Sequence, residues 1–150
     1  MTALLPTIAM IGMLPANGPV AWSFTSQPAS NGSITIDLTA RIEKGWHIYA
    51  TELPNNDGPI ATSFRFMASE AFVVVGKPTE PTPEEHYDPN FGMTVRYHSG
   101  TPHFLLTVMP RTHEAFTFEG EVEFMVCNDK TCLPPTVVPI TVRVEPLQKK

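Results

Sequence analysis

Positive charge is scarce in this sequence. Asp and Glu (15 residues) outnumber Lys and Arg (10 residues), which gives a formal net charge of −5. No run of basic residues is longer than the closing pair Lys149–Lys150. Nucleic-acid binders carry a basic stripe, and basic clusters bind anionic membrane surfaces. The composition therefore argues against both classes, and we expect no nucleic-acid partner.

Helical patterns are also missing. No stretch carries an apolar stripe at helical spacing between capping residues. The 16 prolines are about twice the average usage, which favours short strands joined by turns. The chain has no internal repeat, and its 150 residues fit one domain.

Short apolar segments separated by turns fill the chain from Val20 onward. The clearest is Ser33–Glu43, in which apolar and polar residues alternate as in a half-buried strand. Further strand candidates are 46–50, 62–66, 72–75, 94–97, 104–108, 115–118, 122–126 and 137–144. This series predicts an all-β antiparallel sandwich or barrel. Residues 77–92 lack strand character, and we expect a long loop there, a kind of loop that is often functional.

The N-terminus carries an apolar run, Ala3–Leu14. This run is too short to span a bilayer, and it matches the apolar part of a secretory signal. We expect residues 1–18 to form an export signal or a disordered segment, 19–146 the β-sandwich domain, and 147–150 a tail. Export would place the cysteines where disulfides form and persist.

Cys127 and Cys132 are the only two cysteines, and a four-residue turn, 128–131, separates them. Asn128 and Asp129 favour a tight turn because their side chains bond the local backbone. We therefore expect the cysteines at the mouth of a hairpin, exposed and close enough to bridge. A disulfide that closes so short a loop contributes only about 2 kcal/mol, so exchange chemistry suits the pair better than stabilisation does.

The spacing alone leaves three roles open for the pair: thiol–disulfide exchange, a structural bridge, and Cu(I) binding together with Met125. A structural bridge is the commoner role of a lone pair. Lys130 favours a thiolate, whereas Asp129 opposes it. Two thiolates are half of a zinc site, the histidines lack ligand spacing, and no haem attachment motif is present. We therefore expect no metal and no other cofactor.

The segment MVCNDKTCLPPT (125–136) resembles the active-site segment of the N-terminal periplasmic domain of the thiol:disulfide interchange protein DsbD family. That family shows a cysteine, a short turn with an acidic residue, a second cysteine, and then two prolines. GWHIYA (45–50), GPIATSFRF (58–66) and YDPNFGMTVRY (87–97) are similar to further family segments. The turn between the cysteines is one residue shorter here than in the best-known members.

The resemblance covers about residues 20–144 and implies an immunoglobulin-like antiparallel β-sandwich in the periplasm. It also implies a thiol–disulfide oxidoreductase that takes electrons from a membrane-embedded donor and passes them to oxidised, thioredoxin-like or other periplasmic thiol proteins. The family continues into a membrane carrier and a thioredoxin-like domain, so we expect a free-standing domain or a fragment. The alternative is a non-enzymatic interaction module with a structural disulfide.

Residue roles follow from the same resemblance. Cys132 would form mixed disulfides with partners, and Cys127 would resolve them. Phe91 would be the aromatic residue of a cap loop over the pair, with Asp88 beside it. Tyr49 and His47 would line the site, although ordinary core packing is the alternative for Phe91 and Tyr49.

Overall fold

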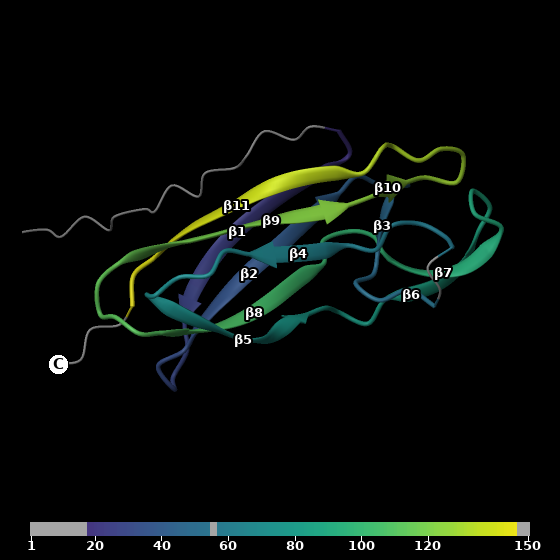
Figure 1. Ribbon diagram of the computed structural model, residues 1–150. Coiled ribbons are helices and arrows are strands. Elements are labelled where there is room, and N and C mark those ends of the chain that lie inside the picture. Colours follow the sequence, from purple (N-terminus) through teal and green to yellow (C-terminus); the bar gives the residue numbers. More distant parts are fainter. Residues whose placement is uncertain (1–17, 55–56, 147–150) are drawn as a thin grey trace, which may run out of the picture.

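The computed structural model describes residues 18–54 and 57–146, and within these ranges the regular structure consists of β-strands only (Figure 1). The strands are β1 (Val20–Pro28), β2 (Ile34–Ile42), β3 (His47–Tyr49), β4 (Ser63–Phe66), β5 (Phe72–Thr79), β6 (Glu84–Asp88), β7 (Met93–His98), β8 (His103–Pro110), β9 (Phe116–Phe124), β10 (Val126–Cys127) and β11 (Thr136–Val144). The expected export signal and tail lie outside the described residues, apart from Gly18.

Two antiparallel sheets, with strand orders β1-β2-β8-β5 and β11-β9-β4, face each other as a sandwich. Alternation builds their shared core, since every second residue of β2 from Ile34 to Ile42 is buried. Trp22 of the first sheet joins the layers: its ring lies 6.0 Å from Phe64 and 5.6 Å from Phe124, both of the second. The predicted all-β, immunoglobulin-like sandwich is confirmed.

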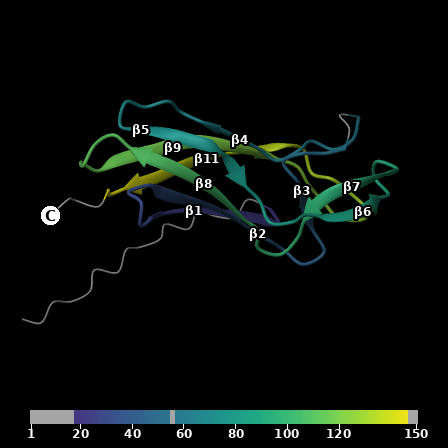
Figure 2. The same cartoon turned by 90° about the horizontal axis from the view of Figure 1, so that it is seen from below.

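A third sheet, β10-β3-β7-β6, extends the sandwich at one end (Figures 1 and 2). The chain enters it from both layers. β3 follows β2 after a turn at Gly45, whose φ is 89°, and β10 follows β9 after the single residue Met125. Because β3 and β10 pair there, with Val126 opposite Ile48, the first cysteine is placed where continuations of the two layers meet.

Two features differ from the sequence-based expectation. β1 was not predicted as a separate strand. The loop expected at 77–92 instead holds the end of β5 and all of β6. β6 shows no periodic pattern in the sequence because it is an edge strand, in which four of the five residues are exposed and only Asp88 is buried. A strand without a buried face shows no alternation of apolar and polar residues.

The strand expected at 115–118 and most of the one expected at 122–126 form one long strand, β9, which runs through Gly120, while Val126 belongs to β10. Gly120 lies opposite Phe66 of β4. A Cβ at this position would stand 2.4 Å from the backbone oxygen of Arg65. The glycine therefore marks a close approach of two strands.

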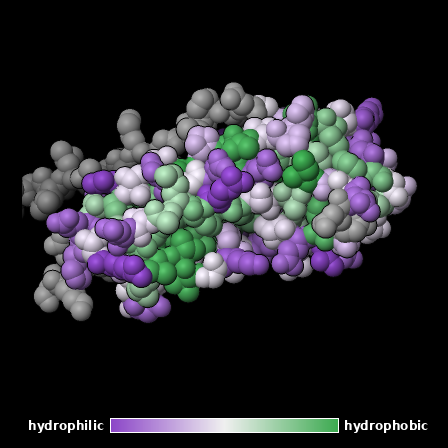
Figure 3. All heavy atoms as spheres, viewed as in Figure 1, coloured by the Kyte–Doolittle hydropathy of each residue, from purple (hydrophilic) through white to green (hydrophobic). Residues whose placement is uncertain are grey.

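The outer face of β5 and β8 exposes an apolar patch. It consists of Val73, Val75, Leu105 and Met109, which are 38–49% exposed, and Val73 pairs directly with Met109. Figure 3 shows the hydrophobic surface over these two strands. The patch lies on the sandwich, away from the third sheet.

Replacing a core aromatic residue tests the sandwich. Phe104 is 0% exposed, and its ring lies 5.9 Å from Trp22 and 5.2 Å from Phe64. We expect Phe104→Ala to lower the free energy of unfolding by about 3–5 kcal/mol in urea titrations, because it leaves a cavity. The neighbouring Leu105→Ala, on the exposed face, should change it by no more than about 0.5 kcal/mol. Equal losses in the two variants would contradict this assignment of faces.

Candidate functional site

The two cysteines form a disulfide across a tight turn. Cys127 ends β10, and the backbones of Cys127 and Cys132 form an isolated antiparallel β-bridge. The backbone N–H of Asn128 donates to the oxygen of Thr131 at 2.9 Å. The side-chain Oδ1 of Asn128 accepts from the backbone N–H groups of Lys130 and Thr131, at 2.9 and 2.8 Å. The predicted hairpin mouth is confirmed, and Asn128 holds the turn.

Exposure distinguishes the two cysteines. Cys127 is 0% exposed, whereas Cys132 is only partly buried. The expectation that both are exposed is wrong for Cys127, because it belongs to the third sheet and packs among residues brought from other strands. Asp129 and Lys130, at the tip of the turn, are exposed.

A second turn covers the cysteines. It joins β6 to β7 and comprises residues 89–92, which we name the cap turn. Asp88 organises it, since its backbone oxygen accepts from Phe91 and Gly92 and its Oδ1 accepts from the N–H of Asn90 at 2.9 Å. The side-chain amide of Asn90 then donates to the backbone oxygen of Asn128 at 2.8 Å. One side-chain hydrogen bond therefore links the cap turn to the cysteine turn.

Phe91 lies in an apolar cluster around the pair. The buried members of the cluster are Tyr49, Val95, Met125 and Cys127, and its partly buried members are Leu53, Phe91, Met93, Tyr97 and Cys132. The Phe91 ring stands edge-on to Tyr49, with centroids 6.2 Å apart. The structure thus brings Phe91 and Tyr49 together with both cysteines.

A buried polar group lies beside this cluster. The hydroxyl of Tyr49 donates to Oδ2 of Asp88 at 2.5 Å, and the two residues are 0% and 3% exposed. Nε2 of His47 lies 3.2 Å from the Tyr49 oxygen and 3.8 Å from Oδ2 of Asp88. All of the residues expected to line the site are therefore in contact, directly or through one another.

Burial sets the charge states of this group. It raises the pKa of Tyr49 well above its ordinary value, and the hydrogen bond that Tyr49 donates to Asp88 acts in the same direction. Burial lowers the pKa of His47 below 6.5, although Asp88 and Asp129 oppose that shift. At neutral pH, Tyr49 therefore keeps its proton and His47 is an uncharged imidazole.

Sequence reasoning missed a second polar cluster, at the base of the third sheet. The carboxylate of Glu80 accepts from the N–H and hydroxyl of Thr51, at 3.1 and 2.9 Å. It also lies 2.8 Å from Nε2 of the buried His98. This cluster ties β7 and the segment after β3 to the chain that follows β5. It has no local sequence signal, because its members are far apart in the chain.

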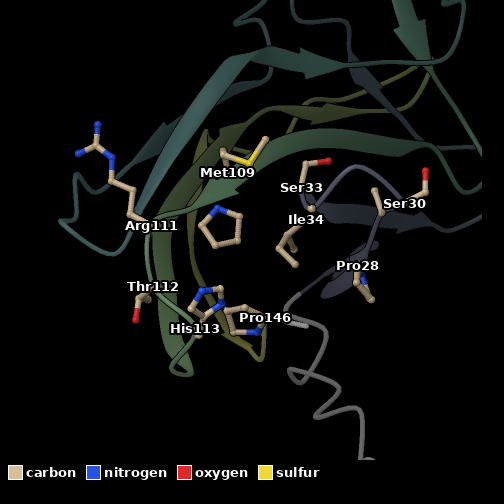
Figure 4. Close-up of a pocket in the computed structure, with 12 residues that line it drawn as sticks. Pro28, Ser30, Ser33, Ile34, Met109, Arg111, Thr112, His113 and Pro146 are labelled. Carbon is tan, nitrogen blue, oxygen red and sulfur yellow. The ribbon is translucent and has the colours of Figure 1, made fainter. Parts of the chain in front are cut away.

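Hollows occur at both ends of the molecule. A small one of about 30 Å³ lies beside the cysteine turn, lined by His47, Asp88, Tyr97 and Asp129 among others. A larger one of about 540 Å³ lies between the turns after β1 and β8 (Figure 4). It is lined by prolines and by Ile34, Met109 and His113. Of these two hollows, the small one lies next to the cysteine turn.

In the described ranges, 18–54 and 57–146, no group of three or more His, Cys, Asp or Glu side chains could hold a metal ion. The same ranges contain no helix long and apolar enough to cross a membrane.

The fold and the site together define a class of protein: an immunoglobulin-like sandwich with a covered cysteine pair at one end. The sequence model of the family described as "Thiol:disulfide interchange protein DsbD, N-terminal" matches residues 17–143, and the chain belongs to this family. No curated protein matches the chain. The family resemblance of the cysteine segment is thus confirmed over nearly the whole described region.

Solved structures agree with the fold. The N-terminal periplasmic domain of ScsB from Proteus mirabilis matches with a TM-score of 0.63 and 16% identity, over 90% of this chain and 50% of that chain. The DsbD N-terminal domain of Neisseria meningitidis, in the reduced form, matches with 0.53 and 15%, over 89% and 95%. The complex of the DsbD and PilB N-terminal domains from that organism matches with 0.50 and 12%, over 91% and 95%. The chain spans half the length of the ScsB domain, and at these identities the likeness shows the fold alone.

The hydrogen bond between Tyr49 and Asp88 can be tested by removing one hydroxyl. We expect Tyr49→Phe to lower the free energy of unfolding by about 1–3 kcal/mol, because a buried carboxylate loses its donor. Tyr87→Phe is the matched control, since Tyr87 lies next to Asp88 on β6 but is 64% exposed, and this change should be nearly neutral. Urea titration of the oxidised proteins measures both. A neutral Tyr49→Phe would show that Asp88 does not depend on this donor.

Proposed function

We propose that this domain carries out thiol–disulfide exchange through Cys127 and Cys132, reducing oxidised proteins in the periplasm. The observation that carries the proposal is the asymmetry of the pair. Cys132 is partly accessible at the end of a tight turn, while Cys127 is buried directly behind it. One thiol that meets partners and a second that stays next to it is the arrangement that exchange requires.

The reaction proceeds in two steps. The Cys132 thiolate attacks a sulfur of the partner disulfide, which forms a mixed disulfide and releases one partner sulfur as a thiolate. The Cys127 thiolate then attacks the Cys132 sulfur, which breaks the mixed disulfide and releases the second partner sulfur. Two electrons pass to the partner, and the Cys127–Cys132 disulfide forms.

The cap turn acts as a gate over the pair. Phe91 covers the cluster that contains the cysteines, which restricts small thiols and oxidants. Two contacts that a partner can break hold it there: the Asn90–Asn128 hydrogen bond and the packing of Phe91 on Tyr49. A partner protein that displaces the cap turn gains access to Cys132.

Cellular setting and partners complete the proposal. The ScsB relative is a periplasmic domain, which supports a periplasmic location, with residues 1–18 as the export signal and 19–146 as one folded domain. A DsbD N-terminal domain forms a complex with a PilB N-terminal domain, which supports a protein partner. We assign thioredoxin-like or other periplasmic thiol proteins as acceptors, and a membrane-embedded protein as donor.

The reduction potential tests the proposed activity. We expect the Cys127–Cys132 couple to equilibrate in a glutathione or dithiothreitol series, at a potential between about −120 and −270 mV, as in exchange proteins. Alkylation and mass analysis of the native reduced protein should modify Cys132 first. A potential well below about −300 mV, with neither thiol reactive, would instead indicate a non-enzymatic interaction module with a structural disulfide.

Removing the cap aromatic tests the gate. An aromatic contact contributes about 1 kcal/mol, so Phe91→Ala should raise the rate of reduction of the disulfide by dithiothreitol roughly fivefold. Phe24→Ala is the control, because Phe24 packs half-buried on the sandwich core. It should lower stability without changing the rate. Equal reduction rates for wild type and Phe91→Ala would remove the gating role.

A further inference from the structure

His47 lies directly opposite Cys127 where β3 pairs with β10. Side chains of directly opposed residues point to the same face of a sheet, with Cβ atoms about 4.5–5.5 Å apart. The Cys127 residue is 0% exposed, and the His47 side chain is 12% exposed. The imidazole therefore lies across the strand pair from Cys127, at a position from which it can take the thiol proton.

The hydrogen bonds around His47 fix which ring nitrogen can accept a proton. The Tyr49 hydroxyl has one proton, and it donates that proton to Asp88. Nε2 of His47, 3.2 Å from the same oxygen, must then be the donor of the second bond. A neutral imidazole with its proton on Nε2 has its lone pair on Nδ1. Nδ1 is the ring nitrogen nearer the backbone, so it is the nitrogen that the short side chain of Cys127, on the neighbouring strand, can reach.

We infer that His47 is the general base for Cys127, and that Asp88 and Tyr49 hold it in the tautomer this role requires. The inference rests on the proposed function and deepens it. Nδ1 accepts the Cys127 proton, and the resulting thiolate attacks the Cys132 sulfur of the mixed disulfide. The partner leaves as a thiolate with the two electrons, and His47 then releases its proton to solvent.

The groups around His47 suit a transient imidazolium. Oδ2 of Asp88 on β6 lies 3.8 Å from Nε2, and Asp129 of the cysteine turn also favours the charged ring. His86 on β6 and burial disfavour it. The Tyr97 ring on β7 lies tilted against His47, with centroids 4.6 Å apart, and Tyr97, with a raised pKa, stays neutral. The ring is thus unprotonated at rest, with carboxylates near enough to stabilise the proton it takes.

The test isolates the second step of exchange. Reduced protein is mixed with dithiodipyridine, a neutral disulfide whose leaving group is coloured. The first release reports modification of Cys132 and depends on probe concentration. The second release reports closure of the disulfide by Cys127, and its rate does not depend on probe concentration. This second release should be absent from the Cys127→Ser variant. The rate of this second release is measured from about pH 5 to pH 10, which brackets the pKa values of histidine and of thiols.

We expect the wild-type closure rate to reach a plateau by neutral pH and to fall as acid protonates His47. In His47→Gln the plateau should be lost, with closure at neutral pH slower by about 10²-fold and equal to wild type near pH 10, where hydroxide ionises Cys127. His47→Phe, which keeps a ring against Tyr97, should behave in the same way. His113→Gln, at the opposite end of the sandwich, should match wild type.

The outcomes distinguish failure of the His47 inference from failure of the proposed exchange activity. If closure is unchanged in both His47 variants, His47 is not the base, while exchange itself stands. Slowing by the same factor at every pH would indicate a structural role and would also overturn the inference. If the wild-type thiols do not react with the probe at all, the proposed function fails and the inference fails with it.

Discussion

The buried hydrogen bond between Tyr49 and Asp88 positions the rest of the site. A carboxylate that is 3% exposed needs donors, because an unpaired buried charge is strongly unfavourable. Asp88 finds them in the Tyr49 hydroxyl for Oδ2 and in the Asn90 N–H for Oδ1. The first donor belongs to the strand that pairs with β10, and the second belongs to the cap turn. One side chain therefore sets the distance between the cysteines and their cover.

Stability and chemistry reside in different parts of the molecule. The large core cluster lies between the two layers of the sandwich, whereas the cluster around Cys127 has four buried members. Regions with few buried apolar contacts open locally at lower free energy than the core. The Glu80 cluster anchors the base of the third sheet through Thr51 and His98. We therefore expect the cap turn to open at a lower free energy than the sandwich.

Local signals predicted the parts of the fold that depend on local patterns. The alternation of Ser33–Glu43 and the Asn-Asp turn between the cysteines each need only their own residues, and both are confirmed. β6 has no buried apolar face that a periodic pattern could reveal, and the burial of Cys127 depends on pairing with the distant strand β3. The sequence places Asn90 in an Asp-Pro-Asn turn, but its bond to Asn128 joins residues 38 positions apart. The family resemblance supplied Phe91, His47 and Tyr49, and ordinary core packing was the alternative for Phe91 and Tyr49.

An all-β scaffold limits how a thiol can be activated. Many reactive cysteines lie at a helix N-terminus, whose dipole stabilises the thiolate, but the described part of this chain contains strands only. Lys130 is exposed at the tip of the turn, and the neighbouring Asp129 cancels much of its field. The proton of the fully buried Cys127 must therefore be accepted by a side chain on a neighbouring strand. A histidine in register with Cys127, held in one tautomer by a tyrosine and an aspartate, meets that requirement with strand geometry alone.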